Sequence, residues 1–312
     1  MKAIVCERLG DPGSLKEIPT PQPGPHELLI RVIAAGVNPI DWKRRERPET
    51  TFPLVLGQDF AGVVSATGNR VTKYAEGQRV FGIAWGHGSF AEYTIAPEDD
   101  RQRPIAKIPD VVGDADAASL PTAGATALGG LDALNVTAGT TLLVLGATGG
   151  VGGFAARIAK DRGARVIGTG SAANEGLAAS LGLDEYVAYD RGDVVEAVKA
   201  LCPNGVDAAY DLVDGAAALE RVATLVRDGG AIASTIGAAD EAALARRNVT
   251  GRNIYAMETP AWSHAGLRTL LDLLERGVIG VRIARELPLS EAVEGLEESK
   301  AGRVNGRLVI MV

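Results

Sequence analysis

Cysteine, histidine and aromatic residues are all scarce in this chain, whose 312 residues include two cysteines, three histidines and 4% aromatics. Cys6 and Cys202 lie far apart, so the disulfide framework of a small secreted domain is not expected, and a reducing cytoplasm fits. A basic excess is missing as well, because the formal net charge is −7 at pH 7. A nucleic-acid-binding surface needs clustered basic residues, so no nucleic-acid partner is expected.

Long hydrophobic runs are also absent. The most apolar region, residues 141–159, is interrupted by glycines and by Arg157, which excludes a membrane span. Residues 1–5 resemble a strand and no long apolar segment follows them, so no signal peptide is expected. The one basic run, residues 43–47, is interrupted by Glu46 and is typical of a solvated loop or helix end. These features predict a cytoplasmic protein without a membrane partner.

What is present is a large apolar content, 46% of the residues, which allows a sizeable core and about two domains. Before residue 120, short β-branched runs alternate with proline and glycine turns, which is typical of an irregular antiparallel β region. After it, strands and helices alternate. We therefore predict a β-rich domain begun by residues 1–120, a second domain over residues 121–257, and a return to the first domain over residues 258–312.

The middle of the chain has the pattern of a doubly wound parallel sheet. Residues 141–145 form a continuous apolar run, as expected of a strand buried on both faces, and Gly163 follows the next helix where a C-terminal cap belongs. Asn174, Asp193 and Ser290 are placed to cap later helices. Further strands are predicted over residues 165–169, 185–189, 206–212, 231–236 and 307–312.

The most informative motif is the glycine-rich segment Gly146-Ala147-Thr148-Gly149-Gly150-Val151-Gly152-Gly153. It follows a predicted strand and opens a predicted helix, which is the context of a dinucleotide-binding fingerprint. Gly149 lets the backbone approach a pyrophosphate, and Gly152 lets helix and strand pack closely. The anion then binds the free N–H groups at the start of the helix. A Walker-type phosphate loop is excluded because no Lys-Ser or Lys-Thr follows the last glycine.

The choice of dinucleotide depends on the end of the second strand. An NAD site usually has an acidic residue there for the ribose hydroxyls, whereas this chain has Thr169-Gly170-Ser171. Ser171 and Asn174 can donate hydrogen bonds to a 2′-phosphate, and Tyr189 with Arg191 can close the pocket. No Lys or Arg follows Ser171 directly, where a bidentate phosphate clamp is expected. On balance these residues favour NADPH.

Further motifs carry a family resemblance. They are Ala34-Ala35-Gly36-Val37-Asn38-Pro39-Ile40-Asp41, Gly57-Gln58-Asp59-Phe60-Ala61-Gly62, Gly88-Ser89-Phe90-Ala91-Glu92-Tyr93, Leu120-Pro121-Thr122-Ala123-Gly124-Ala125-Thr126-Ala127 and Gly302-Arg303-Val304-Asn305-Gly306-Arg307-Leu308-Val309. With the glycine loop, they make the chain resemble the medium-chain dehydrogenases/reductases, and within them the zinc-free quinone oxidoreductases related to zeta-crystallin. The resemblance implies an α/β protein with a GroES-like β-rich catalytic domain, a Rossmann domain and often a homodimer.

Zinc is not expected. A catalytic zinc needs three Cys, His or carboxylate ligands and an open position. Zinc-dependent relatives carry Gly-His-Glu where this chain has Gly57-Gln58-Asp59, and a cysteine where it has Asn38. The cysteines that bind structural zinc are missing too, since none lies between Cys6 and Cys202. His87 is the only histidine with a conceivable position in the cleft.

The resemblance also implies site residues. Asn38 lies near the nicotinamide and Asp41 in the cleft, so both are candidate catalytic residues, although a capped turn would also explain them. Candidate cofactor contacts are Asn38, Thr126, Ala147, Thr148, Gly149, Gly150, Val151, Gly170, Ser171, Asn174, Tyr189, Ile236 and Asn305. Candidates for an apolar substrate wall are Trp42, Phe52, Trp85 and Trp262. The family's pocket tyrosine, a few residues after Asp41, is replaced here by Trp42, Lys43, Arg44 and Arg45.

A hydride transfer without a metal needs an acceptor that is already electron-poor. A quinone or an α,β-unsaturated carbonyl spreads the developing charge over its own conjugation, so the protein mainly orients it and excludes water. The leading hypothesis is therefore an NADPH-dependent quinone or enone oxidoreductase acting on a small molecule. Two alternatives stay open. One is an enoyl-thioester reductase for CoA or acyl-carrier substrates, for which residues 43–47 offer a candidate basic surface for the CoA phosphates. The other is a non-catalytic NADPH-binding protein with a sensing or structural role.

Overall fold

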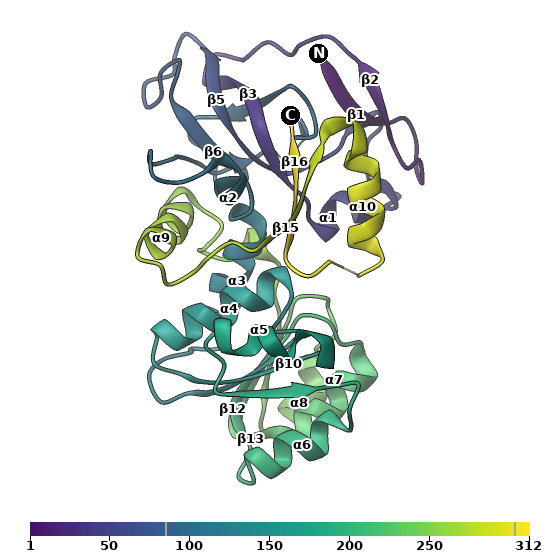
Figure 1. The fold of residues 1–312 in the computed structure, drawn as a ribbon, viewed down its shortest axis with the longest axis vertical. Coiled ribbons are helices and arrows are strands. Elements are labelled where there is room, and N and C mark those ends of the chain that lie inside the picture. The colour runs from purple at the N-terminus through teal and green to yellow at the C-terminus, as the bar shows by residue number, and fades with distance from the viewer. Residues whose placement is uncertain (85, 303) are drawn as a thin grey trace. The chain divides into compact units, whose positions relative to one another are not determined.

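The computed structural model describes residues 1–84, 86–302 and 304–312, which form two compact units (Figure 1). The first unit combines Met1–Ala125 with Trp262–Val312, and the second is Thr126–Ala261. We expected the divisions after residues 120 and 257, and contacts place them after 125 and 261. The first division falls inside helix α3 (Pro121–Ala133), whose start coincides with the change in sequence pattern.

The first unit is built from two sheets. Its strands are β1 (Lys2–Cys6), β2 (Ser14–Glu17), β3 (Glu27–Gly36), β4 (Leu54–Val55), β5 (Asp59–Thr67), β6 (Arg79–Ile83), β7 (Tyr93–Pro97), β8 (Ile105–Lys107), β15 (Ile283–Pro288) and β16 (Arg307–Met311). The smaller sheet has the order β2-β1-β4, and the larger has the order β15-β16-β3-β5-β6-β8, with β7 paired to β3. Pairing is antiparallel except between β15 and β16. The late strand β16 thus completes a sheet begun by the early strand β3.

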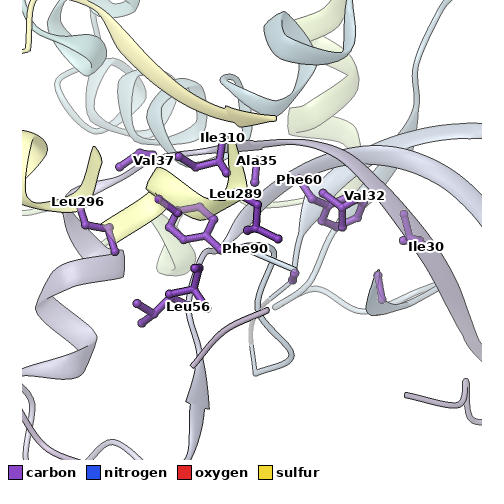
Figure 2. Close-up of a cluster of buried hydrophobic side chains, with 14 of the residues drawn as sticks. Ile30, Val32, Ala35, Val37, Leu56, Phe60, Phe90, Leu289, Leu296 and Ile310 are labelled. Atoms are coloured by element: carbon purple, nitrogen blue, oxygen red, sulfur yellow. The ribbon is translucent and has the colours of Figure 1, made fainter. Parts of the chain in front are cut away.

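Alternation along β3 positions the core of the first unit. In Figure 2 the side chains of Ile30, Val32 and Ala35 from this strand lie with Ile310 of β16 and Leu296 in one buried cluster. Each large aliphatic side chain fully buried in this way contributes about 1.5–3 kcal/mol. The helices of this unit are α1 (Pro39–Arg45), α2 (Asp114–Ala118), α9 (His264–Glu275) and α10 (Ala292–Lys300), with a 3-10 turn at Leu289–Glu291.

The second unit contains one parallel sheet. Its strands are β9 (Thr141–Leu145), β10 (Arg165–Gly170), β11 (Glu185–Ala188), β12 (Val206–Asp211), β13 (Val226–Ser234) and β14 (Thr250–Asn253). Their order is β11-β10-β9-β12-β13-β14, and every pair is parallel. The chain moves outward in one direction from β9 and in the other from β12, so the topological switch lies between these two strands. Ligands of such sheets bind outside the carboxyl ends of the strands at this point.

Helices cover both faces of that sheet. They are α4 (Gly150–Asp161), α5 (Glu175–Ser180), α6 (Val194–Leu201), α7 (Ala216–Val222) and α8 (Glu241–Ala245), with 3-10 turns at Ala172–Asn174, Ala223–Leu225 and Ala256–Glu258. Figure 1 shows α4 and α5 on one face and α6, α7 and α8 on the other. Two-sided coverage explains why Leu142, Leu143 and Val144 of β9 are fully buried. The predicted α/β architecture is confirmed.

The predicted helix ends have mixed outcomes. Gly163 adopts φ +83° after α4, and the side chain of Asp193 accepts hydrogen bonds from Val195 N and Glu196 N at the start of α6, as expected. The prediction for Ser290 was wrong, because Ser290 lies inside a 3-10 turn and Glu291 is the N-cap of α10. Asn174 does occupy the N-cap of α5, but its side chain makes no capping bond. No helix among the described residues is both long and apolar enough to cross a membrane.

Candidate functional site

The glycine loop lies at the carboxyl end of β9, at the topological switch of the second unit. Gly146 has φ +81° directly after the strand, and Gly149 is the N-cap of α4 with no side chain to satisfy the first N–H groups of the helix. The loop is held from β10, because Gly146 N donates to Thr169 Oγ1 (3.1 Å) and Ala147 N donates to Thr169 O (2.9 Å). The arrangement leaves an open helix N-terminus suited to a phosphate group.

Two glycines of this loop have different roles. A Cβ at Gly152 would lie 2.2 Å from Gly146 O and 2.8 Å from Ala147 Cα, so packing alone requires glycine there. A Cβ at Gly149 would meet nothing nearer than Gly146 O at 3.4 Å, which is ordinary contact. Gly149 is therefore not required by the fold. Its lack of a side chain keeps the space above the helix start open.

The end of β10 lies beside the glycine loop. A Cβ at Gly170 would lie 2.8 Å from Thr148 Oγ1, and Asn174 Nδ2 donates to the same Thr148 Oγ1 (3.4 Å). Tyr189 N donates to Gly170 O (3.0 Å), and its side chain is 59% exposed. The structure thus brings five predicted contacts together: Thr148, Gly170, Ser171, Asn174 and Tyr189.

Two neighbouring residues shape this corner of the site. Tyr186, which was not predicted, donates its hydroxyl hydrogen to Ser171 O (2.7 Å) and so fixes the backbone after β10. Arg191 pairs with Glu175 (2.7 Å), and both side chains are largely exposed. An exposed pair of this kind is weak, about 0–1 kcal/mol, so Arg191 can exchange this carboxylate for another anion.

A buried carboxylate organises the ends of β12 and β13. Asp211 is fully buried, its Oδ1 accepts from Val213 N and Asp214 N, and its Oδ2 accepts from Ser234 Oγ (2.7 Å). Ser234 Oγ in turn accepts from Ile236 N (3.3 Å). This network ties the loops after both strands together and holds Ile236, a predicted cofactor contact, with its side chain 43% exposed.

In the first unit, Asn38 and Asp41 are held together at the start of α1. Asn38 is the N-cap, Pro39 takes the first helical position, and Asn38 N donates to Asp41 Oδ2 (2.7 Å). Both side chains are about 1% exposed. The second carboxylate oxygen, Asp41 Oδ1, is buried and has no hydrogen-bond partner among the described residues. The capped-turn interpretation of these residues is therefore correct, and it does not account for Oδ1.

Arg307 joins this cluster from β16. Its Nη2 donates to Asn38 Oδ1 (2.8 Å) and lies 4.0 Å from Asp59 Oδ2. Asp59 is fully buried and accepts from Thr122 Oγ1 (2.5 Å) and Thr122 N (3.0 Å). Arg307 takes the amide oxygen of Asn38, and Asn38 Nδ2 donates to Gly36 O (3.4 Å). Sequence reasoning missed Arg307, which is 269 residues away from Asn38.

Burial governs the protonation of both carboxyl groups. It raises the pKa of Asp41 to about 8, against the lowering effect of the Asn38 N–H. It raises the pKa of Asp59 to about 6, against the lowering effects of the Thr122 hydroxyl and the Arg307 guanidinium. Asp41 is therefore a neutral acid at pH 7, while Asp59 carries the charge that faces Arg307.

The positions that correspond to zinc ligands hold other side chains. Gln58 Nε2 donates to Thr122 Oγ1 (2.7 Å), and Gln58 Oε1 is buried without a hydrogen-bond partner among the described residues. Asn38 already bonds Arg307. Among residues 1–84, 86–302 and 304–312, no group of three His, Cys, Asp or Glu side chains is arranged to hold a metal ion. Amide groups in place of histidine and cysteine make a poor donor set for zinc.

The remaining candidates are spread over both units. Trp42 and Phe52 pack against the buried cluster of the first unit, and Trp262 is 3% exposed with its Nε1 donating to Gln102 O (2.9 Å). Trp262 is therefore buried, Trp42 and Phe52 are half-buried, and Trp85 lies outside the described residues. Asn305 is exposed just before β16. Thr126 lies on α3, and its carbonyl oxygen accepts from the Tyr210 hydroxyl (2.6 Å).

Two sequence families match this chain. The family described as "Alcohol dehydrogenase GroES-like domain" matches residues 24–110, and the family described as "Zinc-binding dehydrogenase" matches residues 181–310. A trans-enoyl reductase of Aspergillus flavipes is 34% identical over 238 residues, which cover 69% of this chain and 68% of that protein.

Solved structures agree with these matches. The quinone oxidoreductase from Coxiella burnetii is 31% identical with a TM-score of 0.88, and the alignment covers 100% of this chain and 99% of that one. A mycobacterial protein solved in complex with NADPH is 28% identical with a TM-score of 0.88, and the alignment covers both chains completely, 100% of each.

Proposed function

The chain belongs to the medium-chain dehydrogenase/reductase superfamily, and on that premise we propose that it is an NADPH-dependent, zinc-independent oxidoreductase of quinones or α,β-unsaturated carbonyls. The superfamily predicted from the sequence is confirmed, and so is its GroES-like domain. Dinucleotide binding is supported above all by the open N-terminus of α4 at the topological switch between β9 and β12.

The preference for NADPH rests on what surrounds the end of β10. Ser171 follows the strand with no carboxylate in the position that binds ribose hydroxyls in NAD sites. Asn174 and Tyr189 lie next to it, and Arg191 is held nearby by Glu175. A 2′-phosphate at this corner would meet the donors of Asn174 and Tyr189 and the Arg191 cation, beside the carboxylates of Glu175 and Asp190. A related structure is bound to NADPH, which supports the same choice.

The chemistry of reduction needs one hydride and one proton. NADPH, when bound, supplies the hydride. A quinone then becomes a hydroquinone, and an enone becomes the saturated carbonyl, once a proton is added. Asp41 is a neutral acid at pH 7 with a buried Oδ1 that makes no hydrogen bond within the described chain, so we assign it the proton. Solvent restores that proton after each turnover.

Asn38 is assigned to orientation of the reactants. Arg307 holds its amide oxygen, Asp41 holds its backbone N–H and Gly36 O accepts from its Nδ2 (3.4 Å), so the amide group is fixed before any ligand arrives. A fixed donor that stabilises developing charge contributes without reorganisation during the reaction. The absence of zinc from the mechanism is supported by the same residues, since Asn38 and Gln58 are poor ligands and both are hydrogen-bonded inside the protein.

An enoyl-thioester reductase is the second candidate, because a trans-enoyl reductase is among the related proteins. It would share the hydride chemistry and differ in the acceptor. A non-catalytic NADPH-binding protein is the third, and absence of turnover with every acceptor would favour it.

We also propose that the protein is cytoplasmic and forms a homodimer, and light scattering tests the dimer. Strand β14 ends the order of the parallel sheet, so its outer edge is a surface where a second copy can pair.

The first experiment is oxidation of NADPH, compared with NADH, against a panel of quinones, enones and enoyl-CoAs, each with and without a chelator. We expect turnover with NADPH that resists the chelator. Loss of activity on chelation would overturn zinc independence. Clear NADPH binding without turnover of any acceptor would overturn the enzymatic proposal, and faster turnover of enoyl-CoA than of quinones would replace the first candidate by the second.

A further inference from the structure

A cavity of about 380 Å³ opens in the first unit beside the end of α1. It is lined by Arg44, Arg47, Glu49, Thr50, Thr51, Pro53, Leu54 and Gly86. All of these residues belong to the first unit. Pockets for small molecules are usually mostly apolar, roughly 300–1,000 Å³ in volume. This cavity has a suitable size but an unusual lining, with two guanidinium groups and two hydroxyl groups.

Arg44 is the unusual member of this lining. Its side chain is 9% exposed, so most of its charge has been removed from water. Burial lowers the pKa of Arg44, while the nearby Asp41 carboxyl raises it. A cation that is nine-tenths buried at a cavity wall attracts an anion more strongly than one in bulk water, because the local dielectric is lower.

Arg47 and the threonines complete the cavity. Arg47 follows Arg44 by one helical turn, with Arg47 N donating to Arg44 O (3.3 Å), and it forms no ion pair within the described chain. Thr50 Oγ1 donates to Arg44 O (2.6 Å), which fixes the loop after α1. Glu49 also lines the cavity, so the two arginines exceed the carboxylates by one charge. The cavity is thus suited to a single anionic group.

We propose that this cavity binds a carboxylate or phosphate group carried by the electron-poor acceptor. The inference rests on the proposed function, because α1 carries Asn38 and Asp41 at its start and Arg44 one turn later. With a rise of about 1.5 Å per residue, Arg44 lies roughly 5 Å along the axis from Asp41. An acceptor with its anionic group a few bonds from the reducible double bond would span this interval. The physiological substrate is therefore an anionic quinone, enone or enoyl thioester.

The test uses matched acceptors and matched variants. One pair is a 1,4-benzoquinone with a carboxymethyl group and its methyl ester, and the other is crotonyl-CoA and the uncharged N-acetylcysteamine thioester. The main variant is Arg47→Gln, since Arg47 is exposed and its loss should not affect folding. Lys43→Gln is the control, because it removes one positive charge from the same basic run, residues 43–47, at a position that does not line the cavity. Arg44→Gln is added if its thermal unfolding matches that of wild type.

We expect Arg47→Gln to lower kcat/KM for the charged acceptor by about tenfold, the usual effect of one charge-assisted hydrogen bond. The uncharged partner of each pair should change less than about twofold, and Lys43→Gln should spare both. An effect confined to the quinone acid identifies a carboxylate, and one confined to crotonyl-CoA identifies a phosphate. Equal effects on the charged and uncharged acceptors would overturn the proposal.

A binding measurement separates this proposal from the enzymatic one. The hydroquinone acid is titrated calorimetrically into wild type and Arg47→Gln, with NADP⁺ present. If no acceptor is reduced, the proposed function fails. Weaker binding of the hydroquinone acid to Arg47→Gln than to wild type would still support the anion site. If acceptors are reduced but the hydroquinone acid binds both proteins equally, the anion site is overturned and the function stands.

Discussion

Replacing Asp41 by asparagine removes the titratable group at the start of α1 while keeping its shape. The retained Oδ1 of asparagine can still accept from Asn38 N, as Asp41 Oδ2 does at 2.7 Å. What is lost is the titratable proton. Because Asp41 is 1% exposed and its pKa is raised to about 8 by burial, the substitution should affect stability in a pH-dependent way.

The size of the effect follows from linkage. Asp41 has an ordinary pKa of 3.8 in the unfolded chain, so between pH 3.8 and about 8 the folded protein holds a proton that the unfolded chain has released. The contribution of Asp41 to stability is complete below pH 3.8 and falls by about 1.4 kcal/mol per pH unit up to about pH 8. At pH 7 the loss is about 4 kcal/mol, and asparagine avoids it. Against this, the new amide N–H₂ is buried without a partner and costs about 1–3 kcal/mol.

We therefore expect the order of stability to reverse with pH. Asp41→Asn should be less stable than wild type by about 1–3 kcal/mol at pH 4 and more stable by a similar amount at pH 7. Urea unfolding followed by circular dichroism at half-unit steps from pH 4 to 8 should place the crossing between about pH 4.5 and 6.

Asp193→Asn is the matched control. Asp193 caps α6, and Arg221 and the backbone N–H groups of Glu196 and Val195 lower its pKa. The contribution of Asp193 to stability is therefore present above its ordinary pKa and is lost as pH falls. The slope of stability against pH for Asp193 thus has the opposite sign to that for Asp41. A stability difference between wild type and Asp41→Asn that stays constant from pH 4 to 8 would refute a neutral, buried Asp41. Since Asp41 is also the proposed proton source, the variant should lose roughly 100-fold in kcat while it gains stability at pH 7.

Three other substitutions test the remaining parts of the structure. Arg307→Met should lower the free energy of unfolding by about 3–5 kcal/mol, because it leaves Asp59 buried without its cation. Adding Asp59→Asn should recover most of this stability in urea unfolding. If the losses of the two single variants simply add in the double variant, the pairing is contradicted. Gly149→Ala should keep the melting temperature of wild type but weaken NADPH binding at least about tenfold in a fluorescence titration. Gly152→Ala should instead lower the melting temperature, because its Cβ would lie 2.2 Å from Gly146 O. Unchanged NADPH affinity in Gly149→Ala would exclude the glycine loop as the phosphate site. Ser171→Asp should lower the ratio of kcat/KM for NADPH to that for NADH at least about tenfold, because a carboxylate repels the 2′-phosphate, and an unchanged ratio would show that the phosphate lies elsewhere.

The second unit could be predicted in detail because its signals are local. The glycine loop, the buried run of β9 and the cap at Asp193 each depend on residues close in sequence, and the structure places them as expected. Helix caps formed by serine were harder to predict. Ser263 caps α9 by accepting from Gly266 N, which was not foreseen, whereas Ser290 was predicted to cap a helix and does not.

The site in the first unit could be predicted only in part. A family resemblance pointed to Asn38 and Asp41, and the hydrogen bond between them is local. Only the structure shows the roles of Arg307 and Thr122 and the cavity at Arg44. Strand pairing and burial bring together segments that are far apart in sequence. The same basic run that suggested a solvated helix end has Arg44 and Arg45 buried. Tertiary packing, rather than local composition, decided which of its cations became accessible.

The late position of β16 has a consequence for how the protein is made. Strand β3 leaves the ribosome early, but its antiparallel neighbour β16 follows only after the whole second unit, and Arg307 comes 182 residues after Ala125 (307 minus 125). At roughly 5–20 residues per second, that interval lasts about 10–35 seconds. During it the first unit has an unpaired strand edge and an uncompensated Asp59. Newly made chains are therefore expected to depend on chaperones at this stage, and the proposed chemistry can begin only after β16 has paired with β3.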